Sequence, residues 1–185
     1  MTVALLAGLL LAVSSYLGVE AIRQYAIRRR VLDVPNSRSS HSAATPRGGG
    51  VVIALATVLT LVIAAAAESL TLSPVILAYL VGATLIAAVG WLDDVRSLSS
   101  GFRLLAQLSA AVLLLIGAGW WDDVILPFAG RVALGWAAVP LALLWIVGMT
   151  NAYNFMDGVD GIAGGQAVVA GVAWAIIGFA TSAPV

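Results

Sequence analysis

A polar stretch between two long apolar runs carries the residues best suited to chemistry. It reads Asn-Ala-Tyr-Asn-Phe-Met-Asp-Gly-Val-Asp-Gly, with an amide or a carboxylate at every third position: Asn151, Asn154, Asp157 and Asp160. On a helix, side chains three residues apart differ in direction by about 60°. Neighbouring groups in this series therefore face each other, while the first and last diverge. Gly158 and Gly161 allow the helix to break. These oxygen donors could hold a hard cation and a polar substrate. The alternative is a capped loop in which Asn and Asp side chains close helix ends.

Two adjacent carboxylates form a second acidic signal. Asp93 and Asp94 come directly after an apolar run that ends at Leu92. Two arginines, Arg96 and Arg103, follow them. Adjacent carboxylates repel each other and gain little as surface charge, so they suggest a bound cation or a charged substrate nearby.

A second pair, Asp122 and Asp123, shows that an Asp-Asp dipeptide is a weak signal by itself. It stands beside Trp120 and Trp121 and is followed by Pro127 and Phe128, a pattern typical of an interfacial belt and a short turn. We interpret this second pair as structural.

A third polar stretch, from Leu32 to Gly50, is rich in Pro, Ser and Gly. Its cationic and hydroxyl donors are Arg38, His41, Thr45 and Arg47, and three glycines follow at 48–50. Arginine side chains and the backbone amides of a helix N-terminus bind phosphate well, so this stretch is interpreted as an anion site, although His41 alone decides nothing. The cluster Arg28–Arg30 just before it is instead typical of a topology anchor.

The elements that must position these residues are membrane helices. Hydrophobic residues make up 62% of the 185 residues and charged residues 10%, against about 45–50% and about 25% in soluble domains. Six charge-free runs are each at least 18 residues long: Met1 to Val19, Gly48 to Ala67, Ser69 to Leu92, Leu104 to Trp121, Val132 to Met156 and Gly161 to Val185. A helix needs about 20 apolar residues to cross the hydrocarbon. The predicted fold is therefore an all-α polytopic transmembrane bundle of about six spans, forming a single integral membrane domain over residues 1–185.

The first apolar run is expected to be retained as a span, because the arginines follow it rather than precede it. Pro74 stands near the start of the third run, where a proline costs little. Pro140, inside the fifth run, is expected to kink its helix.

Basic residues set the expected orientation. Eight of the nine lie between the first and second runs or between the third and fourth, and the exception is Arg131. The positive-inside rule then places the amino terminus outside and the loops at 20–47, 93–103 and 150–161 in the cytoplasm. All three polar stretches would emerge on one face of the membrane and could converge there. Because the chain has no cysteine and one histidine, any metal between them must be held by oxygen.

Taken together, the three stretches resemble the polyprenyl-phosphate N-acetylhexosamine-1-phosphate transferases. The strings that carry the resemblance are Asp33-Val-Pro-Asn36, Arg38-Ser-Ser-His41, Thr45-Pro-Arg-Gly-Gly-Gly50, Asp93-Asp94 and Asn151 to Gly161. The first and third stretches look closest to the branch that starts O-antigen and related surface glycans, rather than the phospho-muramoyl-pentapeptide branch. The resemblance covers nearly the whole chain.

The resemblance implies a reaction and a set of roles. N-acetylhexosamine-1-phosphate would pass from a UDP-N-acetylhexosamine to undecaprenyl phosphate, with release of UMP and a requirement for Mg²⁺. Asp93 and Asp94 match the family's catalytic aspartates, Asn154 matches a magnesium ligand, and Asp160 matches a position near the uracil. Asp157 would bind substrate or support the loop. Independently of the resemblance, Arg38, Arg47 or Arg96 would offset the negative charge that a diphosphate donor and a lipid phosphate bring together, and Arg38, His41 and Arg47 are expected to bind substrate. Asp93 could orient the acceptor, accept a late proton or attack as a nucleophile.

The implied setting is the bacterial inner membrane, with a multi-pass chain and an active site on the cytoplasmic face. Membrane lipid is an expected partner, a homodimer is compatible with the resemblance, and no nucleic-acid partner is expected. Family members are about twice as long, and their later loops supply a further magnesium-binding aspartate and a histidine-rich stretch. These 185 residues therefore resemble an amino-terminal part and are expected to be inactive alone.

Two other functions stay open on the sequence. A transporter or channel fragment would use its polar stretches to line a pathway, but transporters place ionisable residues near the bilayer midplane, whereas the charges here lie at the borders of the runs. A non-catalytic scaffold of a glycan-assembly complex is the other alternative. A lipid-alcohol phosphotransferase with a CDP donor is disfavoured, because the glycine and aspartate repeat contains no arginine.

Overall fold

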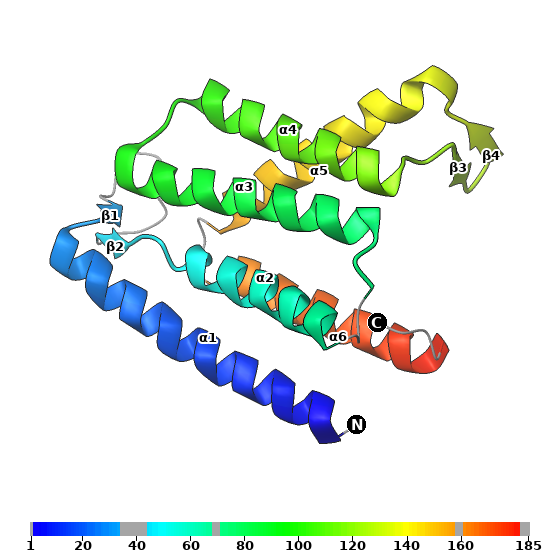
Figure 1. Cartoon of the computed structure of the whole chain (residues 1–185). Coiled ribbons are helices and arrows are strands. Elements are labelled where there is room, and N and C mark those ends of the chain that lie inside the picture. Colours follow the sequence, from blue (N-terminus) through cyan, green and yellow to red (C-terminus); the bar gives the residue numbers. More distant parts are fainter. Residues whose placement is uncertain (1, 34–43, 68–70, 158–160, 182–185) are drawn as a thin grey trace.

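Six helices dominate the architecture, which confirms the predicted all-α bundle (Figure 1). The computed structural model describes residues 2–33, 44–67, 71–157 and 161–181. The helices are α1 (Thr2–Arg29), α2 (Gly50–Ala66), α3 (Pro74–Arg96), α4 (Ser100–Ala118), α5 (Ala138–Met156) and α6 (Ile162–Thr181). Two short antiparallel ladders join them: β1 (Leu32–Asp33) with β2 (Thr45–Pro46), and β3 (Asp123–Leu126) with β4 (Gly130–Ala133).

The helix lengths suit a bilayer. In the described part of the chain, four helical segments are long and apolar enough to cross a membrane: Leu6–Arg29, Pro74–Arg96, Ser100–Ala118 and Gly135–Met156. Gly50–Ala66 and Ile162–Gly178 are shorter apolar helices. Large apolar side chains such as Leu10, Ile116 and Val169 are mostly exposed, which is what a lipid-facing surface requires. Among the described residues, the buried apolar side chains are those of six alanines and Leu115.

Small residues allow α3 and α4 to form the most extensive helix–helix contact. A Cβ added to Gly117 would lie 2.5 Å from the Cβ of Ala78 and 2.6 Å from the carbonyl oxygen of Pro74. Near the middle of the crossing, a Cβ added to Gly82 would lie 3.6 Å from that of Ala110, an ordinary contact. The two backbones therefore approach most closely where α3 begins and α4 ends.

The end of α3 differs from the prediction. Asp93 and Asp94 were expected in a loop, but α3 continues to Arg96, so both carboxylates lie on its last turn. A charge at a span border leaves the helical backbone intact, and the turn ends only at Ser97, which has a left-handed φ of 50°. The hydroxyl of Ser99 then caps α4 by accepting from the N–H of Phe102.

The fifth predicted span begins later than expected. Residues from Gly130 to Ala133 pair with β3 as a hairpin, a 3-10 turn follows over Gly135–Ala137, and α5 starts at Ala138. Pro140 consequently lies in the first turn of α5. The expected kink was wrong, because the first turn has no hydrogen-bonded N–H for a proline to remove.

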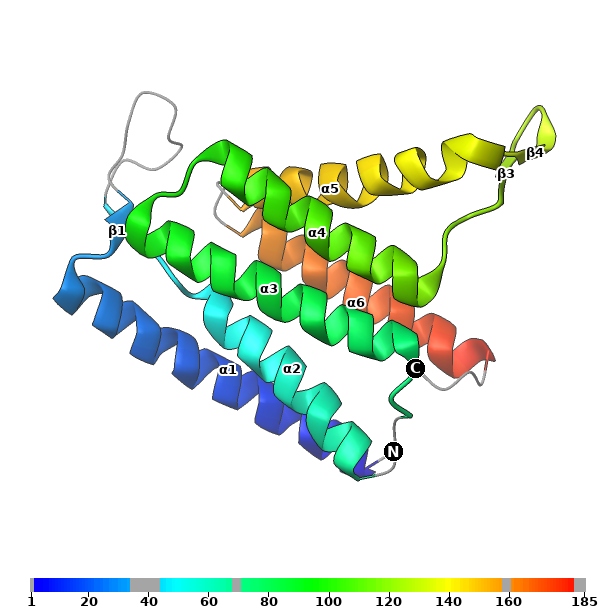
Figure 2. The ribbon, with the colours of Figure 1, turned by 45° about the horizontal axis from the view of Figure 1, so that its top comes forward.

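The bundle has two dissimilar ends (Figure 2). One end carries the β1–β2 ladder, the turn between α3 and α4, the C-terminal end of α5 and the N-terminal end of α6. The β3–β4 hairpin occupies the opposite end. The residues with candidate chemistry and the structural Asp-Asp pair are thus separated by the length of the bundle.

Candidate functional site

An open cavity of about 1090 Å³ lies at the β1–β2 end and extends between the helices. Its walls come from five parts of the chain: Val19 on α1, the segment from β2 into α2, and the helices α3, α4 and α5. The polar lining residues are Thr45, Arg47, Thr57, Tyr79, Asp93, Asp94, Arg103, Gln107, Thr150, Asn154 and Asp157, together with Gly48–Gly50. The described parts of all three polar stretches therefore meet in one cavity, as predicted.

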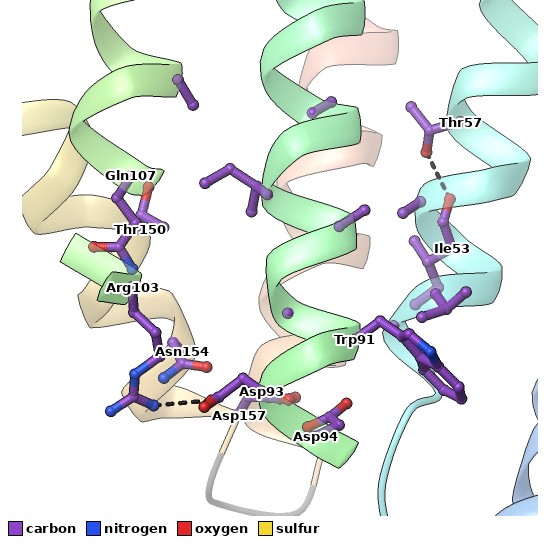
Figure 3. Close-up of a pocket in the computed structure, with 18 of the residues that line it drawn as sticks. Ile53, Thr57, Trp91, Asp93, Asp94, Arg103, Gln107, Thr150, Asn154 and Asp157 are labelled. Carbon is purple, nitrogen blue, oxygen red and sulfur yellow. Dashed lines mark hydrogen bonds and ion pairs between the residues drawn. The ribbon is translucent and has the colours of Figure 1, made fainter. Parts of the chain in front are cut away.

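Asp93 is held in place from two sides. One carboxylate oxygen accepts the backbone N–H of Leu98 at 2.7 Å, and the other forms an ion pair with Arg103 Nη1 at 3.0 Å (Figure 3). The side chain of Asp93 is 21% exposed and that of Arg103 is 44% exposed. Because the α3–α4 turn is short, residues ten apart in sequence meet across it. The carboxylate is thus fixed at the cavity wall with an arginine beside it.

Three further oxygen-bearing side chains share the cavity with Asp93. Asp94 lies on the same turn of α3, while Asn154 on α5 and Asp157 at its C-terminal end approach from the neighbouring helix (Figure 3). Carboxylate and amide oxygens are the donors that Mg²⁺ prefers, usually alongside waters and substrate phosphates. Among the described residues, no group of three or more Asp, Glu, His or Cys is close enough to hold a metal unaided. The donor set therefore suits a Mg²⁺ ion that is completed by a ligand.

The glycine triplet brings backbone close to this cavity. Gly48 is buried and has a φ of +98°, a conformation that favours glycine, and an added Cβ would lie 2.8 Å from the indole ring of Trp91. Arg47 lies just before it, and its N–H donates to the carbonyl of Val31 at 3.2 Å beside the β1–β2 ladder. α2 begins at Gly50 on the cavity wall. An arginine and a helix N-terminus together form a surface that can bind phosphate.

The described side chains of the stretch that begins at Asn151 have different surroundings. Asn151 points to α4, where its Nδ2 donates to Gln107 Oε1 at 2.7 Å, while Asn154 and Asp157 line the cavity. Tyr153 turns the other way, and its hydroxyl hydrogen bonds to the carbonyl of Ala163 at 3.2 Å and to Gln166 on α6. Gly161, with a φ of +80°, immediately precedes α6, which agrees with the expected helix break.

The predicted site residues fall into three groups. Arg47, Asp93, Asp94, Asn154 and Asp157 line one cavity. Arg96 is exposed at the end of α3 and is absent from the described cavity wall. Arg38, His41 and Asp160 lie outside the described residues.

Sequence reasoning missed the roles of Arg103 and Gln107. Arg103 was noted only for its charge, and Gln107 was not singled out. The signal was their spacing of four on a helix that follows Asp93 after a short turn, which places both on the face of α4 toward the cavity.

Comparison with known proteins gives a family match. The model of the family described as glycosyl transferase family 4 matches residues 76–184. A relative in Bacillus subtilis, named probable undecaprenyl-phosphate N-acetylglucosaminyl 1-phosphate transferase, is 36% identical over 149 residues, which are 80% of this chain and 40% of that protein.

Two further relatives bear on the kind of donor. The decaprenyl-phosphate N-acetylglucosaminephosphotransferase of Mycobacterium tuberculosis is 30% identical over 91% of this chain and 43% of its own length. The phospho-N-acetylmuramoyl-pentapeptide-transferase of Streptococcus sanguinis is also 30% identical, over 96% of this chain and 58% of its own length. The chain thus spans less than two thirds of each of these relatives.

Proposed function

The chain belongs to glycosyl transferase family 4, and from that premise we propose that it is the amino-terminal part of a phosphoglycosyl transferase. The proposed reaction passes N-acetylhexosamine-1-phosphate from a UDP-sugar to undecaprenyl phosphate and initiates a cell-surface glycan. An oxygen of the acceptor phosphate attacks the sugar-bearing phosphorus, a new diphosphate bond forms, the old one breaks, and UMP leaves. The relatives' names, which describe transfer of a sugar phosphate to a polyprenyl phosphate, support this reaction class.

One observation carries the proposal: the cavity combines four oxygen donors with two arginines at the end of an apolar bundle. A diphosphate donor and a lipid monophosphate bring several negative charges together, so their reaction needs positive charge on the protein or on a metal. Arg47 and Arg103 line this cavity and would contact phosphate oxygens. The apolar helices around the cavity would hold the lipid acceptor in the bilayer while its head group reaches the polar end.

The residues fit a magnesium ion, which when bound would offset phosphate charge as a Lewis acid. Asp94, Asn154 and Asp157 would hold it from two helices. Asp93 would orient the acceptor, accept a late proton or attack as a nucleophile, and the bonds from Leu98 and Arg103 would hold its carboxylate in place for any of these roles. A strong base is not needed, since an acceptor phosphate with a second pKa of about 6 is mostly ionised at neutral pH.

The proposed location is the bacterial inner membrane, with the site on the cytoplasmic face where UDP-sugars occur. The arginine-rich segment at the end of α1 stands at the same end of the bundle as the cavity, which supports this orientation.

The donor is proposed to be a UDP-N-acetylhexosamine of the surface-glycan branch. Relatives from both branches match with similar identities, so competition between UDP-N-acetylglucosamine and the muramoyl-pentapeptide donor in the assay below tests that choice.

UMP release from membranes tests the function. We would express the 185-residue chain and any genomic extension of it, supply undecaprenyl phosphate, Mg²⁺ and a UDP-sugar, and measure UMP and the lipid-linked product. The form that releases UMP is called the active form below, and we expect it to be the extended one. Release by the short chain would overturn the expectation that it is inactive alone. Absence of release from both forms, with both folded in the membrane, would overturn the proposed function.

A further inference from the structure

Two side-chain amides join α4 to α5 just above the acidic end of the cavity. Asn151 Nδ2 donates to Gln107 Oε1 at 2.7 Å, and Gln107 Nε2 donates back to Asn151 Oδ1 at 3.4 Å. Asn151 Nδ2 also donates to the carbonyl of Val147 on its own helix at 2.8 Å. We call this pair the amide clasp. The clasp joins residues 44 apart in sequence, and one of the two, Gln107, lines the cavity.

The clasp stands one helical turn from the ion pair that holds Asp93. Arg103 and Gln107 are four residues apart on α4, so they lie on the same face of that helix. Arg103 binds Asp93 on α3, and Gln107 binds Asn151 on α5. A single face of α4 is therefore bonded to both of the helices that carry the site's carboxylates.

The fully buried side chains of α5 lie far from its C-terminal end. Within α5, which the structure describes along its whole length, the buried side chains are Ala138 and Ala142. Both lie near its first residues, at the end of the bundle that carries the hairpin. Asn154 and Asp157 lie more than three helical turns beyond Ala142. The polar contacts near the C-terminal end of α5 are the clasp to α4 and the bonds of the Tyr153 hydroxyl to α6, and both can help to set the direction of Asn154 and Asp157.

From this arrangement we propose that Gln107 is a positioning residue. Through the amide clasp it sets the rotation and depth of the last turns of α5, and so keeps Asn154 and Asp157 facing Asp93 and Asp94. The two amides hydrogen-bond to each other from different helices, which makes the clasp a directional restraint that apolar contacts would not supply. Its effect on catalysis rests on the proposed function, whereas its effect on geometry does not.

Spin-label distances in the 185-residue chain test the geometry without any assay of activity. The chain has no cysteine, so labels can be placed cleanly at Val95→Cys on α3 and Phe155→Cys on α5, both exposed positions. We expect one narrow distance distribution in lipid bilayers. Gln107→Leu, which keeps the size of the side chain and removes its amide, should broaden or shift the distribution of distances between the two labels. A distribution unchanged by Gln107→Leu would overturn the proposal.

Two companion variants make the test specific. Ser109→Ala removes a hydroxyl from α4 that bonds only to the carbonyl of Leu105 on the same helix, so it should leave the distance unchanged. The exchange Gln107→Asn with Asn151→Gln moves one methylene from one helix to the other and should restore the narrow distribution. If Gln107→Leu fails to fold, the exchange variant decides: a narrow distribution supports the clasp, and a broad one contradicts it.

Kinetics of the active form test the consequence. Gln107→Leu should lower kcat about 10-fold, because small displacements of positioned groups weaken catalysis strongly. It should also raise the Mg²⁺ concentration for half-maximal rate while changing KM for the lipid little, and the exchange variant should recover both. A loss confined to the amount of folded enzyme, with kcat and Mg²⁺ dependence intact, would overturn the positioning role. If the parent protein releases no UMP, the proposed function fails while the distance measurement still judges the clasp.

Discussion

The two Asp-Asp pairs of this chain stand at opposite ends of one bundle and make similar local contacts. Asp93 forms an ion pair with Arg103 at 3.0 Å, and Asp123 forms one with Arg131 at 2.9 Å. Each pair of carboxylates lies near the border of a membrane-spanning helix. Neither the dipeptide nor its arginine therefore distinguishes a reactive centre from a structural turn.

The difference lies in what surrounds each pair. Asp93 and Asp94 share a cavity with side chains from α2, α4 and α5. Asp123 pairs with its arginine across a two-stranded hairpin whose side chains are largely exposed. The first pair thus lies in a cavity formed by several helices, and the second lies at the start of an exposed hairpin. A site is made by the convergence of separate elements, and a charge motif only marks where to look for it.

The largest expected effect comes from Asp94. Asp94→Asn keeps the shape of the side chain and removes its charge, so kcat/KM for UMP release by the active form should fall about 1000-fold, or about 4 kcal/mol. The matched change Asp122→Asn at the hairpin end should leave kcat/KM near the parent value. Equal losses from both substitutions would remove the distinction between the two ends.

A smaller loss is expected from the arginine of the cavity. Arg103→Gln frees Asp93 from its ion pair and removes a positive charge from the phosphate-binding wall, so kcat/KM should fall about 50-fold, or about 2.3 kcal/mol. Arg103→Lys keeps the charge without the planar fork and should give an intermediate rate. Steady-state kinetics at fixed Mg²⁺ would measure both, and parental rates in Arg103→Gln would exclude Arg103 from the site.

Backbone geometry offers a comparison in stability rather than rate. Gly48→Ala forces a left-handed φ on alanine and drives its Cβ into Trp91, and we expect about 2 kcal/mol of destabilisation. Gly130→Ala in the hairpin has a φ of +68° but open space around it, so it should cost about 1 kcal/mol from strain alone. Denaturant unfolding followed by tryptophan fluorescence would give both values. A larger cost at Gly130 would show that the Trp91 contact is not tight.

The smallest effect should come from the hairpin's own ion pair. The Arg131 side chain is 75% exposed, so Arg131→Gln should change the free energy of unfolding by less than about 0.5 kcal/mol. UMP release should stay at the parental rate. A clear loss of activity here would mean that the hairpin end contributes to the reaction, and would contradict the assignment of the two pairs.

Composition and run length predict most of the bundle, because a bilayer leaves few alternatives to long apolar helices. They do not predict where each helix ends. α1 runs on to Arg29, past the predicted border at Val19, where the i,i+3 ion pair of Glu20 with Arg23 stabilises the helix. The β3–β4 hairpin was read partly as a span, because its residues beyond Arg131 continue an apolar run and only pairing with β3 shows them to be a strand.

The sequence predicted which segments of the chain form the candidate site, but it did not predict which side chains bond to each other there. The three-residue spacing predicts that Asn151 and Asp160 point apart, and because Asp160 lies outside the described residues this stays a prediction. The pairing of Asp93 with Arg103 depends on the turn that reverses the chain at Ser97. The clasp between Gln107 and Asn151 depends on how α4 packs on α5. Both contacts depend on tertiary packing, and the spacing of four between Arg103 and Gln107 indicates only that the two side chains share a face of α4.

The close crossing of α3 and α4 at Gly117 has a genetic consequence. Gly117 lies about 21 Å along α4 from Arg103, yet any larger side chain there must spread α3 and α4 at their far ends. Because a helix is rigid, displacing α4 at Gly117 also changes its position at the end that carries Arg103. A selection for heat-sensitive alleles should therefore recover substitutions at Gly117 whose defect resembles that of an active-site mutant.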